Sequence, residues 1–217
     1  MTTRVMIADD HAIVREGLRR ILEGQEGIEV AGEAVNGHEV MDRVRAGGFE
    51  LLLLDLSMPG KSGIELIKQV RDEAPRLRIL VLTMHEEDQY AVRAIRAGAQ
   101  GYLTKESAPS QLVLAIRKVA EGRPWISANV AEQLALDAMP GGDDDEPHKH
   151  LSDREFEVFQ LLVGGRSVSE IAAQLHLSVK TVSTHKTRIL QKMSAQSVAD
   201  LVRYAIRHHL SPEAPSL

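Results

Sequence analysis

Short apolar segments alternate with amphipathic segments through about the first 120 residues, and this alternation constrains the fold more than any other feature of the sequence. The segments expected as strands are residues 4–8, 28–34, 51–54, 79–82 and 101–103. The segments expected as helices are residues 12–22, 38–46, 64–73, 88–97 and 111–121. Residues 51–54 and 79–82 are continuous apolar runs, which are typical of strands covered on both faces. Five strand–helix units in a row predict an α/β fold, a doubly wound five-stranded parallel sheet.

The C-terminal part of the chain has a different pattern, in which every predicted element from residue 151 onward is a helix. Ser152 and Glu155 form a capping box that marks the start of the first helix, and Gly164 and Gly165 end it. A short second helix over 169–174, a third from Ser178 to about residue 192, and a fourth over 197–208 follow. We therefore expect a second, smaller, all-α domain of four helices.

A linker separates the two patterns. Residues 139–150 read MPGGDDDEPHKH, and two Pro, two Gly and four acidic residues cannot build a core. Residues 124–138 before it could hold one short amphipathic helix with Ser127 as its N-cap. We place the first domain at residues 1–123, the linker with this possible helix at 124–147, and the second domain at 148–217. The linker is expected to be flexible.

Composition narrows the classes of function. The chain has no cysteine, which excludes disulfides, thiolate metal sites and cysteine catalysis. The N-terminus lacks the apolar region of a signal peptide, and no apolar run approaches the roughly 18 residues that span a bilayer, so we expect a cytoplasmic protein without a membrane partner. From residue 148 onward the chain carries nine Lys and Arg against six Asp and Glu, a net charge of +3, while the remainder carries −8. This asymmetry favours two modules with different partners.

Five polar side chains directly follow the predicted strands: Asp9 and Asp10, then Asp55, Thr83 and Lys105. Ligands of doubly wound sheets bind at the carboxyl ends of the strands, so these side chains should face one crevice. Three crowded carboxylates repel one another unless a cation joins them, and oxygen ligands suit Mg²⁺. A carboxylate can also attack phosphorus, and a hydroxyl and an ammonium can hold a phosphoryl group. Together these residues predict a magnesium-dependent phosphorylation site.

The third helix of the C-terminal domain contains no acidic residue. Val179, Val182 and Ile189 should face the core. A polar stripe lies opposite, formed by Lys180, Thr184, Thr187 and Gln191, with Ser183 at its border and with Lys186, Arg188 and Lys192 around it. Cations that meet phosphates and small polar groups that approach base edges suit the major groove of DNA.

The first domain resembles the receiver domain of two-component response regulators over about residues 3–121. The resemblance rests on ADD (residues 8–10), LLDLSMPGKSG (53–63), LT (82–83) and GAQGYLTK (98–105). It implies a flavodoxin-like fold in which Asp55 accepts a phosphoryl group from a cognate sensor histidine kinase. It also implies that Thr83 and Lys105 contact the phosphoryl oxygens and that Tyr102 is the switch aromatic.

The same resemblance implies the metal ligands and the residues that set the phosphoryl lifetime. Asp10, Asp55 and the backbone carbonyl of Ser57 should bind Mg²⁺ directly, with Asp9 acting through water. Ser57 and His85 occupy the positions that flank the attacking water and tune dephosphorylation.

The second domain is similar to the LuxR-type helix-turn-helix of the NarL/FixJ group over about residues 150–210. The resemblance rests on residues 151–167, on SEIAAQLHLSVKTVSTHKTRILQKM (169–193) and on the final helix. It implies base reading by Ser183, Thr184 and Thr187, although many relatives have lysine at the first of these positions. The full set of residues expected to bind DNA is Lys180, Thr181, Ser183, Thr184, His185, Lys186, Thr187, Arg188 and Lys192.

The resemblance also implies how the protein acts on DNA. Two copies should bind two half-sites of double-stranded DNA, contact RNA polymerase, and form a homodimer on phosphorylation. The last helix should pair the copies through apolar residues, namely Val198, Leu201, Val202 and Ala205. Since a flexible linker cannot transmit strain, we expect the unphosphorylated first domain to mask the DNA-binding surface.

Three other functions are alternatives to a phosphorylation-controlled transcription factor. A phosphatase of the haloacid dehalogenase type needs a second Asp two residues after the first, where this chain has Ser57. A receiver that switches without phosphorylation usually lacks part of the acid pocket, and a ligand-sensing LuxR-type activator needs a sensory cavity in its place. We expect no enzyme activity beyond self-phosphorylation from a phosphodonor and autodephosphorylation.

Overall fold

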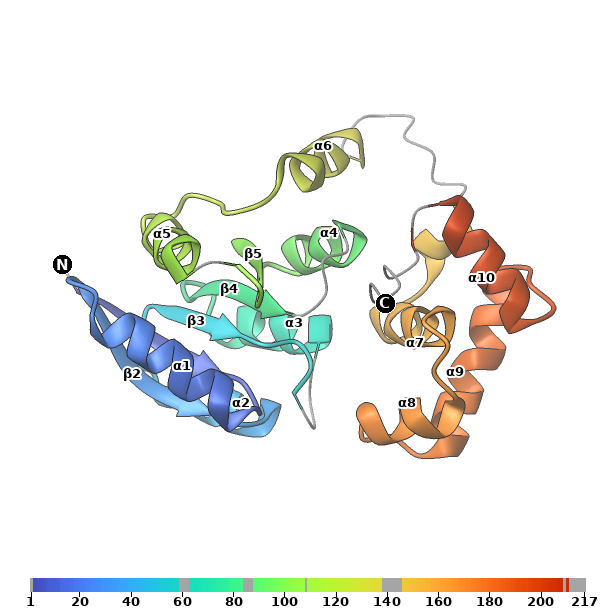
Figure 1. Ribbon diagram of the computed structural model, residues 1–217, viewed down its shortest axis with the longest axis horizontal. Helices are drawn as coiled ribbons and strands as arrows, with labels where there is room; N and C mark the ends of the chain where they lie inside the picture. Colours follow the sequence, from blue (N-terminus) through green and yellow to red (C-terminus); the bar gives the residue numbers. More distant parts are fainter. Residues whose placement is uncertain are drawn as a thin grey trace. The chain divides into compact units, whose positions relative to one another are not determined.

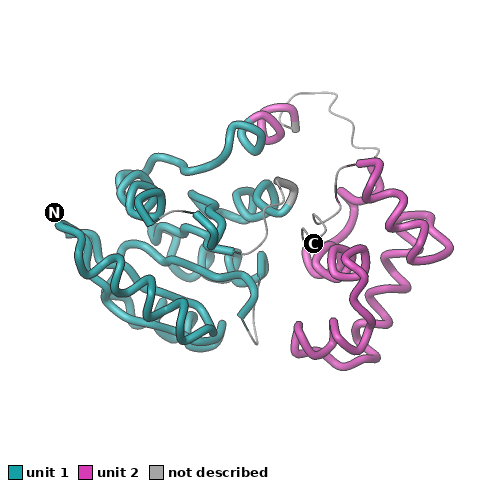
Figure 2. Tube along the Cα trace, in the orientation of Figure 1, with its two compact units in different colours: residues 1–131 teal, residues 132–217 magenta. Residues whose placement is uncertain are grey.

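The computed structural model describes residues 2–58, 63–83, 88–107, 109–137, 146–208 and 210. The chain divides into two compact units, Met1–Ala131 and Glu132–Leu217, shown in two colours in Figure 2. The division falls inside one helix of the segment that was expected to link the domains. Within the described ranges, no helix combines the length and apolar character that crossing a bilayer requires.

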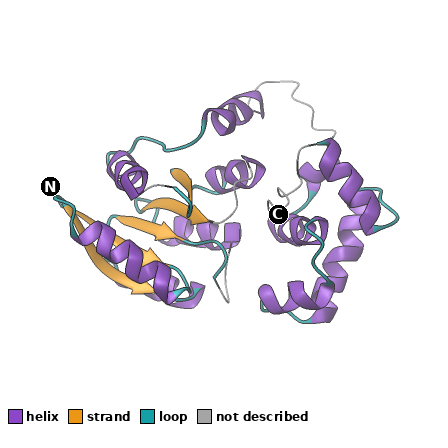
Figure 3. Cartoon of the chain, in the orientation of Figure 1, coloured by secondary structure: helices purple, strands orange, loops and turns teal. Residues whose placement is uncertain are grey.

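The first unit is built on a parallel sheet of five strands in the order β2-β1-β3-β4-β5. The strands are β1 (Thr3–Ala8), β2 (Ile28–Ala34), β3 (Leu51–Leu54), β4 (Arg78–Thr83) and β5 (Gly101–Thr104). The helices between and after them are α1 (Ala12–Glu23), α2 (Gly37–Ala46), α3 (Gly63–Glu73), α4 (Asp88–Arg96) and α5 (Pro109–Ala120). The predicted doubly wound α/β fold is confirmed, with helices on both faces of the sheet (Figures 1 and 3).

Burial explains why these sequences form central strands. All four residues of β3 are almost fully buried, and alternate residues along a strand point to opposite faces. Leu51 and Leu53 join a core cluster that includes side chains of α1 and α5, which leaves Leu52 and Leu54 for the opposite face. A strand covered on both faces must be apolar at every position, which is why β3 and β4 were readable as unbroken apolar runs.

The topology brings the ends of β1 and β3 together. The chain leaves β1 for β2 on one side of the sheet and returns to β3 on the other side. Ala8 and Leu54, the last residues of β1 and β3, are paired in register. The residues that follow them, Asp9 and Asp55, therefore start side by side at the carboxyl edge, where the strand order switches.

The segment after α5 is attached to the edge of the sheet. The backbone N–H of Tyr102 donates to the carbonyl oxygen of Trp125 at 2.9 Å, and the N–H of Trp125 donates to Gln100 at 3.0 Å. These bonds form a parallel bridge between Gly101 and Trp125. Helix α6 (Ala128–Asp137) follows, and the Ser127 hydroxyl accepts a hydrogen bond from the N–H of Val130. The first part of the expected linker is thus fixed to β5.

From residue 146 onward, the described part of the second unit forms a short 3₁₀ helix and then four α-helices. They are η1 (Pro147–His150), α7 (Asp153–Val163), α8 (Val168–Gln174), α9 (Val179–Lys192) and α10 (Val198–Arg207). Ser152, Ser167 and Ser197 each open a helix with a reciprocal capping box. Phe156 and Phe159 of α7 are fully buried. Helix α9 packs against both α7 and α8, as in a helix-turn-helix.

Two expectations about apolar residues of this unit were wrong. Val179 was expected in the core but is 51% exposed, because it is the first residue of α9 and lies before the buried turn around Val182. Leu201 and Ala205 were expected to pair two copies of the chain but are completely buried in their own domain. The spacing of apolar residues identified the apolar faces of α10. It could not show which face packs in the domain core and which is left for a second copy of the chain.

Candidate functional site

The carboxyl edge of the sheet holds the polar residues that follow the strands. Each is fixed by a backbone hydrogen bond that continues the ladder one residue beyond its strand. Asp9 donates its N–H to Ala34 at 3.1 Å, Asp55 donates to Ala8 at 2.8 Å, and Lys105 donates to Thr83 at 2.7 Å. The ends of the strands therefore place these three side chains at one edge of the sheet.

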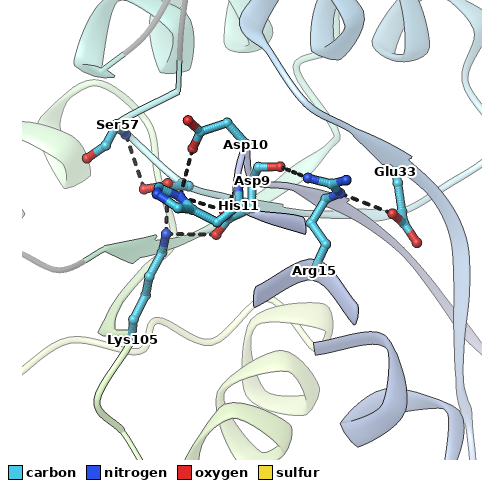
Figure 4. Close-up of polar contacts among 8 residues, drawn as sticks. Asp9, Asp10, His11, Arg15, Glu33, Ser57 and Lys105 are labelled. Carbon is cyan, nitrogen blue, oxygen red and sulfur yellow. Dashed lines mark hydrogen bonds and ion pairs between the residues drawn. The ribbon is translucent and has the colours of Figure 1, made fainter. Parts of the chain in front are cut away.

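A lysine joins two buried carboxylates at the centre of this edge (Figure 4). Lys105 Nζ lies 2.7 Å from Asp9 Oδ2 and 2.8 Å from Asp55 Oδ2. The other oxygens accept backbone hydrogen bonds, Asp9 Oδ1 from His11 at 2.8 Å and Asp55 Oδ1 from Ser57 at 3.1 Å. Asp55 is thus held in place by both of its oxygens.

Burial and pairing act in opposite directions on these charges. Burial raises the pKa of the Asp55 carboxyl above its ordinary value, although the hydrogen bond and charge of Lys105 oppose the shift. Burial alone would lower the pKa of Lys105, but its bonds to Asp55 and Asp9 outweigh burial and raise that pKa. The ammonium is therefore the main local charge that offsets the carboxylates.

Asp10 and His11 complete a cluster at the mouth of the pocket. Ligand atoms of Asp9, Asp10, His11 and Asp55 all lie within 4.8 Å of one another. His11 Nδ1 is 3.0 Å from Asp10 Oδ1, and the imidazole is 64% exposed (Figure 4). The sequence analysis did not single out His11, although its place directly after the Asp pair was the available signal. Three clustered carboxylates form an oxygen donor set that fits a hard divalent cation such as Mg²⁺.

Arg15 of α1 holds the backbone of Asp9 in place (Figure 4). Its Nη1 donates to the carbonyl oxygen of Asp9 at 2.8 Å, and its Nε lies 3.2 Å from Glu33 Oε2 at the end of β2. Arg15 was not among the residues predicted from the sequence.

The predicted switch residues lie on the two strands beside the acid cluster. Thr83 is fully buried at the end of β4, in register with Thr104 of β5. Tyr102 is half-buried and lines a pocket of 310 Å³ with residues that include Ala91 of α4, Trp125 and Val130. Strand β5, which carries the predicted switch aromatic, therefore also carries the start of the linker. Ser57 is exposed beside Asp55, and His85 lies outside the described residues.

The outer face of α9 carries most of the residues predicted to bind DNA. Its exposed members are Lys180, Ser183, Thr184, Thr187, Arg188 and Lys192, and its half-buried members are Thr181, His185 and Lys186. Two of these residues, His185 and Lys192, interact with other residues of their own domain. Burial first, and then the charge of Arg154, lower the pKa of His185 and favour its neutral ring. Lys192 Nζ lies 2.7 Å from Glu155 Oε2 and 3.1 Å from the His150 carbonyl oxygen.

Comparison with known families accounts for both units. The response regulator receiver domain matches residues 5–117, and the luxR family of bacterial regulatory proteins matches residues 149–205. The chain belongs to the response regulators. It is a receiver domain joined to a LuxR-type DNA-binding domain, as the sequence analysis predicted, and it acts in two-component control of transcription.

The similarity to other response regulators extends over nearly the whole chain. Response regulator UvrY of Escherichia coli O6:H1 is 38% identical over 206 residues, which cover 95% of this chain and 94% of UvrY. RcsB of Salmonella enterica serovar Typhimurium, bound to promoter rprA in the presence of phosphomimetic BeF₃⁻, is 31% identical with a TM-score of 0.64, covering 94% of this regulator and 98% of RcsB. Another structure has two RcsB dimers on two parallel DNAs, with 31% identity, a TM-score of 0.58 and coverage of 95% and 98%.

The ion pair between buried Glu155 and exposed Lys192 links α7 and α9 in a pH-dependent way. Burial opposes ionisation of Glu155, but hydrogen bonds from Lys192 and Ser152 outweigh it and lower the pKa of this carboxyl. A lowered pKa stabilises the folded domain above the ordinary glutamate value of about 4.3, and this contribution is lost as the pH falls through the folded-state pKa.

We expect Glu155→Gln to destabilise the DNA-binding domain near pH 7 by on the order of 1 kcal/mol, because Lys192 is partly exposed and its pairing is screened. The difference from wild type should shrink as the pH falls through the lowered folded-state pKa of Glu155, because the carboxyl is then protonated in both states. Urea denaturation followed by the NMR signals of Phe156 and Phe159 measures it, with Glu132→Gln on the exposed surface of α6 as the control. A difference that persists at low pH would show that the charge of Glu155 is not responsible.

Proposed function

We propose that Asp55 is the phosphoryl acceptor of this response regulator. An oxygen of Asp55 attacks the phosphorus of a phosphohistidine on a sensor kinase, or of a small phosphodonor, and the imidazole or donor group leaves with the electron pair of the broken bond. The observation that carries this assignment is the position of Asp55, buried at the switch in strand order and held by Ser57 and Lys105. The regulator would act chemically on itself alone.

The surrounding residues supply the binding of the phosphoryl group. The Lys105 ammonium bridges Asp55 and Asp9 and would turn to a phosphoryl oxygen, while the Thr83 hydroxyl would contact another. Asp10, Asp55 and the Ser57 carbonyl would hold Mg²⁺ directly, with Asp9 acting through water. Mg²⁺ would neutralise charge that develops on the phosphoryl oxygens. Ser57 and His85 remain proposed as residues that tune dephosphorylation.

Incubation with Mg²⁺ and a small phosphodonor tests the proposal. We expect the intact protein to gain the mass of one phosphoryl group, and peptide mapping should place that group on Asp55. Removal of divalent cations with EDTA should prevent the gain. A phosphoryl group on another residue, or no gain in mass under any condition, would refute the assignment.

We also propose that α9 binds the major groove and that phosphorylation controls this binding in a homodimer on two half-sites. The support is the acid-free outer face of α9 and the similarity to RcsB, which binds promoter DNA. With Leu201 and Ala205 in the core, the apolar stripe left for pairing on α10 is Val198, Val202 and the 61% exposed Ile206. We place the protein in the cytoplasm with its DNA, a sensor kinase and RNA polymerase as partners.

Coupling between the receiver and DNA binding starts at the segment on β5. Tyr102 is hydrogen-bonded through its backbone to Trp125 and shares a pocket with Val130 of α6. Movement of Thr83 and Tyr102 toward the phosphoryl group would therefore act directly on the beginning of the linker. We still propose that this movement releases a masked DNA-binding surface. The first part of the linker, however, is docked on β5, where a flexible linker was expected.

Lys180 and Lys186 should contact DNA phosphates and carry no sequence information. We expect Lys180→Ala or Lys186→Ala to weaken binding to specific and random DNA alike, and to lower the slope of log K against log salt by about one unit each. Fluorescence anisotropy at several salt concentrations measures the slope. Gln191→Ala, on the same face of α9 but uncharged, should leave it unchanged. An unchanged slope in the lysine variants would contradict phosphate contacts.

A further inference from the structure

The two threonines at the centre of the outer face of α9 use their hydroxyl protons inside the helix. Thr184 Oγ1 donates to the carbonyl oxygen of Lys180 at 3.0 Å, and Thr187 Oγ1 donates to that of Ser183 at 3.1 Å. A threonine hydroxyl has one proton, so neither residue can donate to a base while it makes this bond. Both side chains are exposed.

The orientation of the hydroxyls determines what these threonines present to a ligand. The Cβ of threonine carries one hydroxyl and one methyl, and its side chain is rigid about χ1. When the hydroxyl is directed to the carbonyl of the preceding turn, the methyl is the branch that remains available on the exposed side. Thr184 and Thr187 therefore offer apolar groups where their residue type suggests polar ones.

Val179 adds a third apolar group to the same helix. It is 51% exposed, and it precedes Ser183 by four residues and Thr187 by eight, so the three follow one side of the helix. Because recognition helices contact base edges with residues of their N-terminal part, an exposed valine at the start of α9 is placed for contact with a base.

The base edges of the major groove have one apolar group, the C5-methyl of thymine. We propose that Val179, Thr184 and Thr187 read thymine through contacts between methyl groups, and that the hydroxyls of the two threonines do not donate to bases. This inference rests on the proposed binding of α9 to DNA and names the chemistry of its target. Lys180 and Lys186 would position the helix through phosphates without affecting the choice of base.

Substitutions that separate the methyl from the hydroxyl test the proposal. Thr→Val keeps the methyl and replaces the hydroxyl by a second methyl, whereas Thr→Ser keeps the hydroxyl and removes the methyl. A half-site is first selected from random DNA with the phosphorylated full-length protein. We expect Thr184→Val and Thr187→Val to retain the ratio of specific to random affinity within about twofold, and the serine variants to lose roughly three- to fivefold each.

Removal of the thymine methyl from the DNA completes a double-mutant cycle with the removal of the threonine methyl from the protein. Replacing a contacted thymine by deoxyuridine should reduce wild-type affinity by the same roughly three- to fivefold, and should cost the corresponding serine variant nothing further. Val179→Thr, which replaces one methyl by a hydroxyl, should show a smaller loss of the same kind. Thermal denaturation of each variant checks that the domain remains folded.

The outcomes distinguish this inference from the proposed function. Specific binding that is lost in the valine variants and kept in the serine variants would mean that the hydroxyls read the bases, and would overturn the inference alone. An unchanged affinity for the selected half-site when each thymine is replaced by deoxyuridine would also overturn the inference alone. If phosphorylated wild-type protein selected no sequence at all, the proposed DNA function would fail and the inference with it.

Discussion

Replacement of Asp55 by Asn should abolish phosphorylation of the regulator. The amide has the size and shape of the carboxylate, and its oxygen can still accept the hydrogen bond from Ser57. Its nitrogen cannot serve as the nucleophile, and Lys105 retains Asp9 as an ion-pair partner at 2.7 Å. The fold should therefore remain while the chemistry is lost. Intact-mass measurement after incubation with Mg²⁺ and a phosphodonor gives the result.

Asp42→Asn is the matched control for that experiment. Asp42 lies on α2, its side chain is 76% exposed, and it is paired with Arg45 outside the acid pocket. This variant should be phosphorylated to the wild-type extent. Wild-type phosphorylation of Asp55→Asn would instead show that another residue is the acceptor, and the proposed function of the receiver domain would need a different site.

The second large effect is expected in the core of the DNA-binding domain. Phe159 is completely buried, with its ring centroid 5.9 Å from that of Phe156. Phe159→Ala should cost about 3–5 kcal/mol. A domain of this size is stable by only roughly 3–10 kcal/mol, so a large fraction of the variant should be unfolded in this domain. DNA binding should fall with it.

The receiver domain should not follow this loss, because the two units have separate cores. Hydrogen exchange measured by mass spectrometry should show faster exchange in peptides of α7 and α9 and unchanged exchange in β1, β3 and β4. Phosphorylation of Phe159→Ala should match that of wild type. Ile206→Ala, at a 61% exposed position of α10, is the control and should leave exchange in α7 unchanged. Loss of phosphorylation in the Phe159 variant would contradict the independence of the units.

The receiver fold and its pocket were predictable because local patterns agree with the topology. Strands buried on both faces are continuous apolar runs, and polar residues directly after them must lie at one edge of a parallel sheet. The pairing of Ala8 with Leu54 then places Asp9 and Asp55 side by side. The motifs that carry the resemblance to receiver domains lie in these same short segments. The resemblance and the hydrophobic pattern therefore predict the same pocket.

What the sequence could not predict depends on contacts between distant segments. The bridge between Trp125 and Gly101 involves one residue of an irregular segment and has no periodicity to reveal it. Spacing shows that α10 has apolar residues on two sides, but only the packing of α7 shows that Leu201 and Ala205 belong to the core. The ion pair of Lys192 with Glu155 was not predicted, because the two residues lie 37 positions apart in the chain.

The central claim is that phosphorylation of Asp55 controls DNA binding by this regulator. Titration of a labelled operator with unmodified wild-type protein, phosphorylated wild-type protein and Asp55→Asn treated with the same phosphodonor tests it most directly, with dimer content measured in the same samples. We expect phosphorylation to raise the affinity and the dimer content of wild type together, and to leave Asp55→Asn at the unmodified level. Equal affinities of unmodified and phosphorylated wild type would contradict the claim, and phosphorylation would then have to act after DNA is bound.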